Sequence, residues 1–333
     1  MNSPGRGVPR PFAGARALAV GVAMLALALG FATDEALASG DLAPAQVRRA
    51  TGFWTPARMA RARPLDHLRT GSPRISSAPA RISALSPHVY PPTSPAPEAG
   101  ASAVPETVPD PTAVPERTNG VVFLVAPFGL GRCSGTSVNA PSYSVVITAG
   151  HCIDEGDFFG DIFTRWVFVP GYRFGQRPFG VFPARWVGTT RQWGTTHNEN
   201  FDVGALVVER NERGRLLGKA VGGTGLAWGL KPNQTFDVHG YSAEQPFDGE
   251  TQQLCPQTRF LGHDPRSFLS PGPLDLAVSC EVTGGSSGGG WTIDGHILNG
   301  LTAYGYSGDP DTDFGPYFGR EVGRLYVRAR RVR

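Results

Sequence analysis

The sequence has few cysteines and little net charge, and both shortages exclude classes of protein. Four cysteines occur among 333 residues, with no C-x-x-C pair and no histidine at metal-ligand spacing on both sides, so the pattern does not predict a zinc site. The formal net charge is +3, and residues 118–333 carry nineteen Arg plus Lys against twenty Asp plus Glu. Because residues 118–333 are so close to neutral, their charge does not favour nucleic acid as a partner.

Long hydrophobic runs are also scarce. The main one covers residues 17–32, with three arginines before it and the A-x-A pattern Ala36-Leu37-Ala38 after it. This order is typical of a signal peptide, and the run falls short of the ~20 residues that span a bilayer. We therefore predict a signal peptide over 1–38 and a secreted protein that is not held in a membrane after cleavage. In an exported chain, an even number of cysteines favours disulfides.

The next segment, residues 39–118, has the composition of a poorly packed region. Residues 39–117 hold fourteen of the thirty prolines, with many Ala and Ser. Because proline fixes φ and lacks a backbone N–H, we expect no regular structure in the second half of this segment and little buried apolar surface in any of it. Two interpretations stay open: a propeptide that is removed, with a processing point at 115–118, or a spacer that is retained.

From about residue 119 the pattern becomes that of a folded domain. Turn-forming residues recur about every ten positions between short apolar runs. This spacing predicts an all-β sandwich or barrel. The runs predicted as strands are 121–125, 145–147, 166–169, 203–208, 236–241, 296–301 and 302–306. Only the tail, about 319–330, has the pattern of a helix.

A histidine and an aspartate stand at the ends of two of these runs. His151 lies in Thr148-Ala149-Gly150-His151-Cys152, where small residues let the chain turn tightly after a strand. Asp202 precedes the run 203–208, and a carboxylate at the edge of a core needs a partner. Histidine exchanges protons near neutral pH, and an aspartate can fix its tautomer and orientation. We therefore predict His151 as a general base that Asp202 orients.

The third motif is the glycine-rich segment 283–290, which reads Thr-Gly-Gly-Ser-Ser-Gly-Gly-Gly. It follows the apolar run 276–280, which places it in a folded region and not in a linker. Glycines allow the backbone N–H groups of Gly285 and Ser287 to point at one spot, which forms an oxyanion hole for acyl transfer. The pattern G-x-S-G-G has Ser287 at its centre and favours it over Ser286 as the nucleophile.

The order of these motifs along the chain separates two kinds of hydrolase. The glycine-rich segment also fits the G-x-S-x-G elbow of α/β-hydrolases, in which the acid and then the histidine follow the serine. Here 46 residues follow Ser287, and His296 is the only histidine among them. The order His151, Asp202, Ser287 is instead the chymotrypsin order.

Five segments resemble the bacterial glutamyl-endopeptidase-like branch of the chymotrypsin-fold serine proteases. They are TAGHC at 148–152, FDVGALVV at 201–208, TGGSSGG at 283–289, WVFVPGY at 166–172 and FGPYFG at 314–319. The resemblance covers about residues 120–325. It implies an all-β fold of two six-stranded antiparallel barrels, followed by a short C-terminal helix. The barrels and the helix would cover about 119–215, 230–318 and 319–330.

The resemblance also implies an activity. His151 and Asp202 would come from the first barrel and Ser287 from the second, with the active site in the cleft between them. The enzyme would cleave peptide or protein substrates through an acyl-enzyme, with no metal or organic cofactor. We expect a secreted monomer and leave attachment to the cell wall open. The place of residues 39–118 between a signal peptide and a protease favours a propeptide.

Two disulfides are implied by the same resemblance. Cys133 and Cys152 would close a loop beside the catalytic histidine. Cys255 and Cys280 would close a loop in the second barrel.

The sequence departs from related patterns at three positions. Ser286 stands where animal zymogens have an aspartate that pairs with the new N-terminus, so that activation switch is not expected. Thr302 stands where glutamyl-specific relatives have a histidine in the primary specificity pocket. Glu281 stands where trypsin-like enzymes have their pocket aspartate. The residue preferred at the cleaved bond therefore stays open, with Thr302 and Glu281 as the candidate pocket residues.

Three other functions remain compatible with these patterns. An esterase could use the same triad, because the triad does not determine which acyl group is bound. A binding module could use the same fold without catalysis, although its usual sign is a broken triad. A structural cell-wall protein could retain the proline-rich segment as a stalk.

Overall fold

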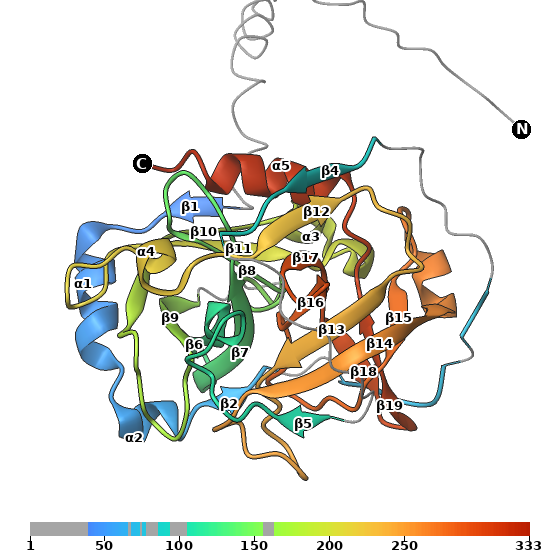
Figure 1. Ribbon diagram of the computed structural model, residues 1–333, viewed down its shortest axis with the longest axis horizontal. Helices are drawn as coiled ribbons and strands as arrows, with labels where there is room; N and C mark the ends of the chain where they lie inside the picture. The colour runs from blue at the N-terminus through green and yellow to red at the C-terminus, as the bar shows by residue number, and fades with distance from the viewer. Residues whose placement is uncertain (1–38, 66–67, 74, 78–85, 94–104, 156–162) are drawn as a thin grey trace, which may run out of the picture. The chain divides into compact units, whose positions relative to one another are not determined.

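The computed structural model describes residues 39–65, 68–73, 75–77, 86–93, 105–155 and 163–333 (Figure 1). The predicted signal peptide at 1–38 lies outside them. The described residues belong to one compact unit. None of their helices is long and apolar enough to cross a membrane.

The first sheet closes into a barrel of antiparallel strands. Its order is β10-β11-β8-β7-β6-β9, and β9 pairs back onto β10. The strands are β6 (Asn119–Ala126), β7 (Gly129–Ser137), β8 (Val145–Thr148), β9 (Thr164–Pro170), β10 (Phe182–Thr189) and β11 (Gly204–Val208). Their apolar residues fill the interior, and Val122, Phe168 and Leu206 are fully buried. The predicted six-stranded first barrel is therefore present, and the four predicted strands before residue 210 are confirmed.

The second sheet is larger and is not purely antiparallel. The run β18-β19-β15-β14-β13-β16-β17 is antiparallel, whereas β12 pairs in parallel with β17. The strands are β12 (Gly225–Trp228), β13 (Thr235–Gly240), β14 (Gln253–His263), β15 (Leu276–Ser279), β16 (Gly290–Ile293), β17 (Ile297–Leu301), β18 (Tyr304–Tyr306) and β19 (Asp309–Gly315). Within the described residues no strand pair closes this sheet into a barrel. The prediction of a second six-stranded antiparallel barrel is thus confirmed only as a mostly antiparallel sheet.

In the described part of the N-terminal segment, five short strands add to the two sheets. They are β1 (Ser39–Asp41), β2 (Arg63–Pro64), β3 (Leu68–Arg69), β4 (His88–Tyr90) and β5 (Glu106–Thr107). They pair with β10, β7, β18, β12 and β14, respectively. Of these, β3 and β4 form the two ends of the second sheet, where they pair with the backbone N–H and C=O groups of β18 and β12.

The expectation that residues 39–117 bury little apolar surface is wrong. Helices α1 (Pro44–Phe53) and α2 (Pro56–Met59) lie in the first half, and Trp54 and Met59 are 2% and 0% exposed. The expectation of no regular structure in the second half is also wrong, because β4 and β5 lie there. The prolines are tolerated because each helix has one at its first position, where no backbone N–H is needed, and because the strands are very short.

The helix predicted at the C-terminus is confirmed as α5 (Arg320–Ala329), which lies along β4 and β12 in Figure 1. The expectation that it is the only helix is wrong. The other helical elements are α3 (Arg191–Thr196), α4 (Leu217–Val221), η1 (Glu116–Thr118), η2 (Glu199–Phe201) and η3 (Pro265–Leu269), besides α1 and α2. Most of them are too short to show the 3.6-residue apolar period on which a helix prediction depends.

Candidate active site

His151 and Asp202 are held together by two hydrogen bonds. His151 follows β8, and Asp202 stands between η2 and β11, so neighbouring strands β8 and β11 bring them together. Asp202 Oδ2 lies 2.7 Å from His151 Nδ1, and Asp202 Oδ1 accepts the backbone N–H of His151 at 2.8 Å. The residues are 1% and 2% exposed. Because Nδ1 faces the carboxylate, Nε2 is the ring nitrogen placed to exchange a proton with a reacting group.

Gly150 is required by this close approach. A Cβ atom at this position would lie 2.8 Å from Asp202 Oδ1 and 2.8 Å from Cγ of Trp193. The Trp193 ring also packs against the His151 ring, with centroids 6.3 Å apart. The small residue before the histidine therefore makes room for the carboxylate and the indole that fix the imidazole.

Ser287 lies in the loop between β15 and β16, and hydrogen bonds join this loop to the first barrel. Ser134 of β7 donates its backbone N–H to Ser287 O at 2.8 Å and its hydroxyl to Gly285 O at 2.9 Å. Gly285 and Gly288 adopt φ values of +97° and +83°, which favour glycine. Cys152, the neighbour of His151, has its Sγ 3.8 Å from Ser287 O. The structure thus brings the serine loop against the turn that carries His151.

The two adjacent serines differ in their contacts. Ser286 donates its hydroxyl to Thr283 O at 2.5 Å, within its own loop. Ser287 donates its hydroxyl to the backbone oxygen of Leu65 at 3.4 Å, a residue 222 positions earlier in the chain. Only the second hydroxyl therefore faces a peptide group from another part of the chain.

Both implied disulfides are present. Cys133–Cys152 joins β7 to the turn after His151, and Cys255–Cys280 joins β14 to the end of β15. Ligand atoms of Cys133, His151 and Cys152 lie within 4.8 Å of one another. The two sulfurs are bonded to each other, so neither is a thiolate, which is the form of cysteine that binds a metal.

The candidate specificity residues lie in different environments. Thr302 is buried, and its hydroxyl donates to Asp313 Oδ2 at 2.6 Å, which also accepts Trp291 Nε1–H at 3.1 Å. Burial raises the pKa of Asp313 to about 8. Glu281 is half-buried in the turn after β15. Sequence reasoning missed Asp313, because no local motif marks an aspartate of β19 as the partner of Thr302.

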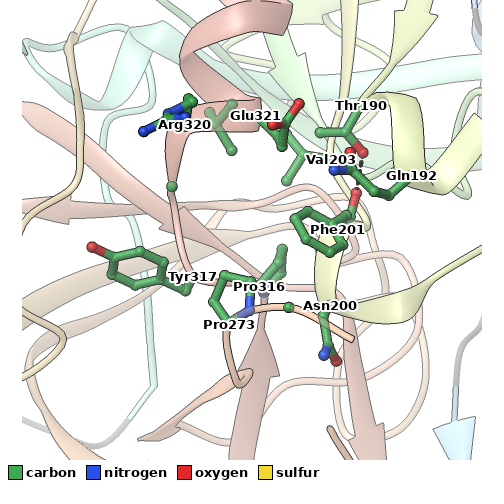
Figure 2. Close-up of a pocket in the computed structure, with 13 residues that line it drawn as sticks. Thr190, Gln192, Asn200, Phe201, Val203, Pro273, Pro316, Tyr317, Arg320 and Glu321 are labelled. Carbon is green, nitrogen blue, oxygen red and sulfur yellow. Dashed lines mark hydrogen bonds between the residues drawn. The ribbon is translucent and has the colours of Figure 1, made fainter. Parts of the chain in front are cut away.

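A cavity of about 400 Å³ lies beside η2 and the start of α5 (Figure 2). Phe201 and Val203, the neighbours of Asp202, line one part of it, and Tyr317, Arg320 and Glu321 line another. None of its lining residues is His151, Asp202 or Ser287. The candidate reaction site is therefore the serine loop and not this cavity.

Comparison with known proteins identifies the family. No protein-family model and no curated protein matches the chain. The structure is similar to that of protease Anisep from Arthrobacter nicotinovorans, with 30% identity, a TM-score of 0.61 and coverage of 68% of this chain and 100% of the other. It is also similar to a thermostable serine protease, AL20, from an extremophilic microorganism, with 31% identity, a TM-score of 0.59 and coverage of 65% and 98%. The chain belongs to the chymotrypsin-fold serine proteases.

More distant structures share the fold alone. A Glu endopeptidase has 14% identity and a TM-score of 0.53 over 70% of this chain and 98% of the other. A scabies mite inactivated protease paralogue has 16% identity and a TM-score of 0.50 over 68% and 99%. Since the fold occurs in a protein described as inactivated, activity has to be argued from the residues of the site.

Proposed function

We propose that this chain is a secreted serine endopeptidase in which His151, Asp202 and Ser287 form the catalytic triad. Ser287 Oγ attacks the scissile carbonyl while His151 Nε2 takes its proton. Asp202 keeps the imidazole in the correct tautomer and stabilises the imidazolium. The amine leaves with a proton from His151, and water then hydrolyses the acyl-enzyme.

The oxyanion hole in this proposal consists of the backbone N–H groups of Gly285 and Ser287. The positive φ of Gly285 supports it, because such a backbone conformation can turn successive N–H groups toward one point. Donors arranged before the reaction stabilise the tetrahedral intermediate without reorganisation.

The observation that carries the proposal is the contact between Asp202 and His151. One carboxylate binds both the ring Nδ1 and the backbone N–H of the same histidine, at 2.7 and 2.8 Å. A general base requires both its tautomer and its position to be fixed, and this carboxylate fixes both. Secretion is supported by the two disulfides, since such bonds persist in oxidising compartments.

The test compares the purified secreted protein with its Ser287→Ala variant, and with Ser286→Ala as the matched control. All three are incubated with a fluorophosphonate probe and with a mixed peptide pool that is read by mass spectrometry. We expect wild type and Ser286→Ala to be labelled at Ser287 and to cut peptides, and Ser287→Ala to do neither. Loss of the nucleophile should lower kcat by a factor on the order of 10⁶.

The other outcomes separate the alternatives. Labelling at Ser287 without any peptide cleavage would favour an esterase that uses the same triad. Labelling at Ser286 would move the nucleophile by one residue. Absence of labelling in every form, including those in which the N-terminal segment is displaced, would favour a binding module on this fold.

A further inference from the structure

Part of the N-terminal segment lies directly across the nucleophile. Leu65 is 2% exposed, donates its N–H to Arg132 O of β7 at 3.1 Å and accepts the Ser287 hydroxyl at 3.4 Å. Just before it, β2 pairs in parallel with β7 of the first sheet. Just after it, β3 pairs in parallel with β18 of the second sheet, and Ser307 N donates to Arg69 O at 2.9 Å. Residues 63–64 and 68–69 therefore pair with different sheets, and Leu65 contacts the serine.

This contact does not present a peptide bond for cleavage. In acyl transfer the substrate carbonyl oxygen sits on the N–H groups of the oxyanion hole. In the described part of the chain, neither Gly285 nor Ser287 donates its backbone N–H to Leu65 O. The nucleophile itself donates to this oxygen instead. The segment thus covers Ser287 in an unreactive arrangement.

Four residues after Leu65, the Arg69 guanidinium enters an acidic and aromatic pocket. Its Nη1 donates to Asp264 Oδ2 at 2.9 Å, its Nη2 pairs with Glu199, and its Cζ lies 3.6 Å from the ring centre of Tyr304. The Tyr306 hydroxyl lies 3.3 Å from Nη1. The side chains of Arg69 and Asp264 are 14% and 0% exposed, so this ion pair is largely removed from water.

The hydrogen bonds of the pocket determine where its charge lies. The Tyr304 hydroxyl is 2.8 Å from Oδ2 of Asp264 and 2.8 Å from Oδ2 of Asp275. A hydroxyl has one proton to donate, so one of the two carboxyl groups has to keep its own. Burial raises the pKa of Asp275 well above its usual range. Asp275 is therefore the protonated partner, and Asp264 has the buried negative charge that Arg69 neutralises.

All the side chains that surround the guanidinium come from the protease domain, on η2, β18 and the start of η3. The pocket consequently remains when the N-terminal segment leaves, and a buried carboxylate without a counter-ion is costly. Thr302, two residues before Tyr304, exchanges backbone hydrogen bonds with Gly288 and Gly289, at 2.7 and 2.9 Å. Arg69 follows Leu65 by four residues, which span at most ~14 Å. A peptide that lies over Ser287 can therefore reach the pocket.

We propose that Asp264, Tyr304, Tyr306 and Glu199 form a subsite for a guanidinium group. In the intact chain Arg69 occupies it and holds Leu65 over Ser287, so that the N-terminal segment acts as an internal inhibitor. After the segment leaves, the subsite binds an arginine side chain of the substrate, at one fixed position within four residues of the cleaved bond. This inference rests on the proposed peptidase function.

The first experiment measures the rate at which a fluorophosphonate labels Ser287 in the full chain. Arg69→Met keeps an unbranched apolar stem and removes the guanidinium and its charge, so the segment should bind less tightly, and labelling should be at least ~10-fold faster than in wild type. Arg63→Met is the matched control, because Arg63 is an exposed arginine of the same segment, and its rate should equal that of wild type. Equal rates for all three proteins would overturn the inhibitory role of Arg69.

The second experiment measures the subsite with the Arg69→Met protein. Synthetic peptides that carry arginine or its neutral analogue citrulline, at the position that cleavage mapping identifies, are compared. We expect KM to be ~10-fold lower for arginine, with kcat within about twofold, because the subsite lies away from the reacting atoms. Glu199→Gln should reduce this ratio several-fold, and Glu199 is exposed enough for the variant to fold.

Equal KM values for the two peptides would overturn the subsite. That failure differs from failure of the proposed function, in which Ser287 is not labelled in any variant and no peptide is cut. A protein that is labelled and cuts peptides without a preference for arginine retains the peptidase function and loses only this inference.

Discussion

Individual carboxyl groups have opposite roles in this protein. Asp202 faces a histidine and a backbone N–H, which suit a negative charge. Asp313 is fully buried among Thr302, Trp291 and apolar side chains, and its burial raises its pKa to about 8. One type of residue therefore provides a proposed catalytic anion at one site and a neutral hydrogen-bonding group at another.

The raised pKa of Asp313 predicts a pH dependence of stability. In the unfolded chain this group ionises near pH 4, whereas the folded protein keeps its proton up to about pH 8. The stabilisation that it provides is therefore complete below about pH 4 and is lost as the pH rises to about 8. Asp313→Asn has no such proton, so we expect its free energy of unfolding to fall less than that of wild type between pH 5 and pH 8.

Urea denaturation at pH 5, 6.5 and 8 measures this difference. Asp311→Asn is the control, because Asp311 is an exposed aspartate of the same strand. This variant should follow wild type at every pH. An equal loss of stability in wild type and Asp313→Asn would show that Asp313 is ionised in the folded protein.

At the scale of secondary-structure elements, the two disulfides connect different strands and should have separable effects. Their sequence separations are 19 and 25 residues, so the loss of either should lower the free energy of unfolding by about 3 kcal/mol. Replacing both Cys133 and Cys152 by Ala should also lower kcat, because this bond anchors the turn that carries His151. Replacing Cys255 and Cys280 should leave kcat within about twofold.

Both double variants are assayed at a temperature far below their melting transitions, so that unfolding does not contribute. Equal effects on kcat would show that the turn after β8 keeps its position without its disulfide.

At the scale of the whole molecule, the N-terminal segment is part of the packed core. The Trp54 ring packs against Phe123 of β6 with centroids 5.2 Å apart, and its Nε1 donates to Arg165 O at 2.7 Å. Trp54→Ala should therefore lower the free energy of unfolding of the full chain by about 3–5 kcal/mol. Phe128→Ala, at a position 59% exposed, should change it by less than about 1 kcal/mol.

Thermal and urea denaturation of the full-length proteins check this prediction. A Trp54→Ala protein as stable as wild type would mean that α1 and α2 contribute nothing to the folding of the protease domain.

The strands that sequence patterns predicted have a local signal. Runs such as Val121–Val125 and Val145–Ile147 are continuously apolar and rich in valine and isoleucine, so their burial is visible locally. β7 was not predicted, because Gly129–Ser137 is rich in glycine and serine and is ordered by its neighbours β6 and β8. The burial of apolar side chains in residues 39–117 was not predicted for a related reason. These side chains are few and far apart, and they become buried only against the domain.

The sequence by itself determined the chemical groups of the site and their order. Small residues around His151, glycines around Ser287 and an aspartate before a buried strand are local requirements, so they are visible as local motifs. Only the tertiary structure decided that Arg69 binds Asp264, 195 positions away, and that Leu65 covers Ser287, 222 positions away. Such contacts join short segments whose own residues show no period or motif, because their stability comes from partners that folding alone brings together.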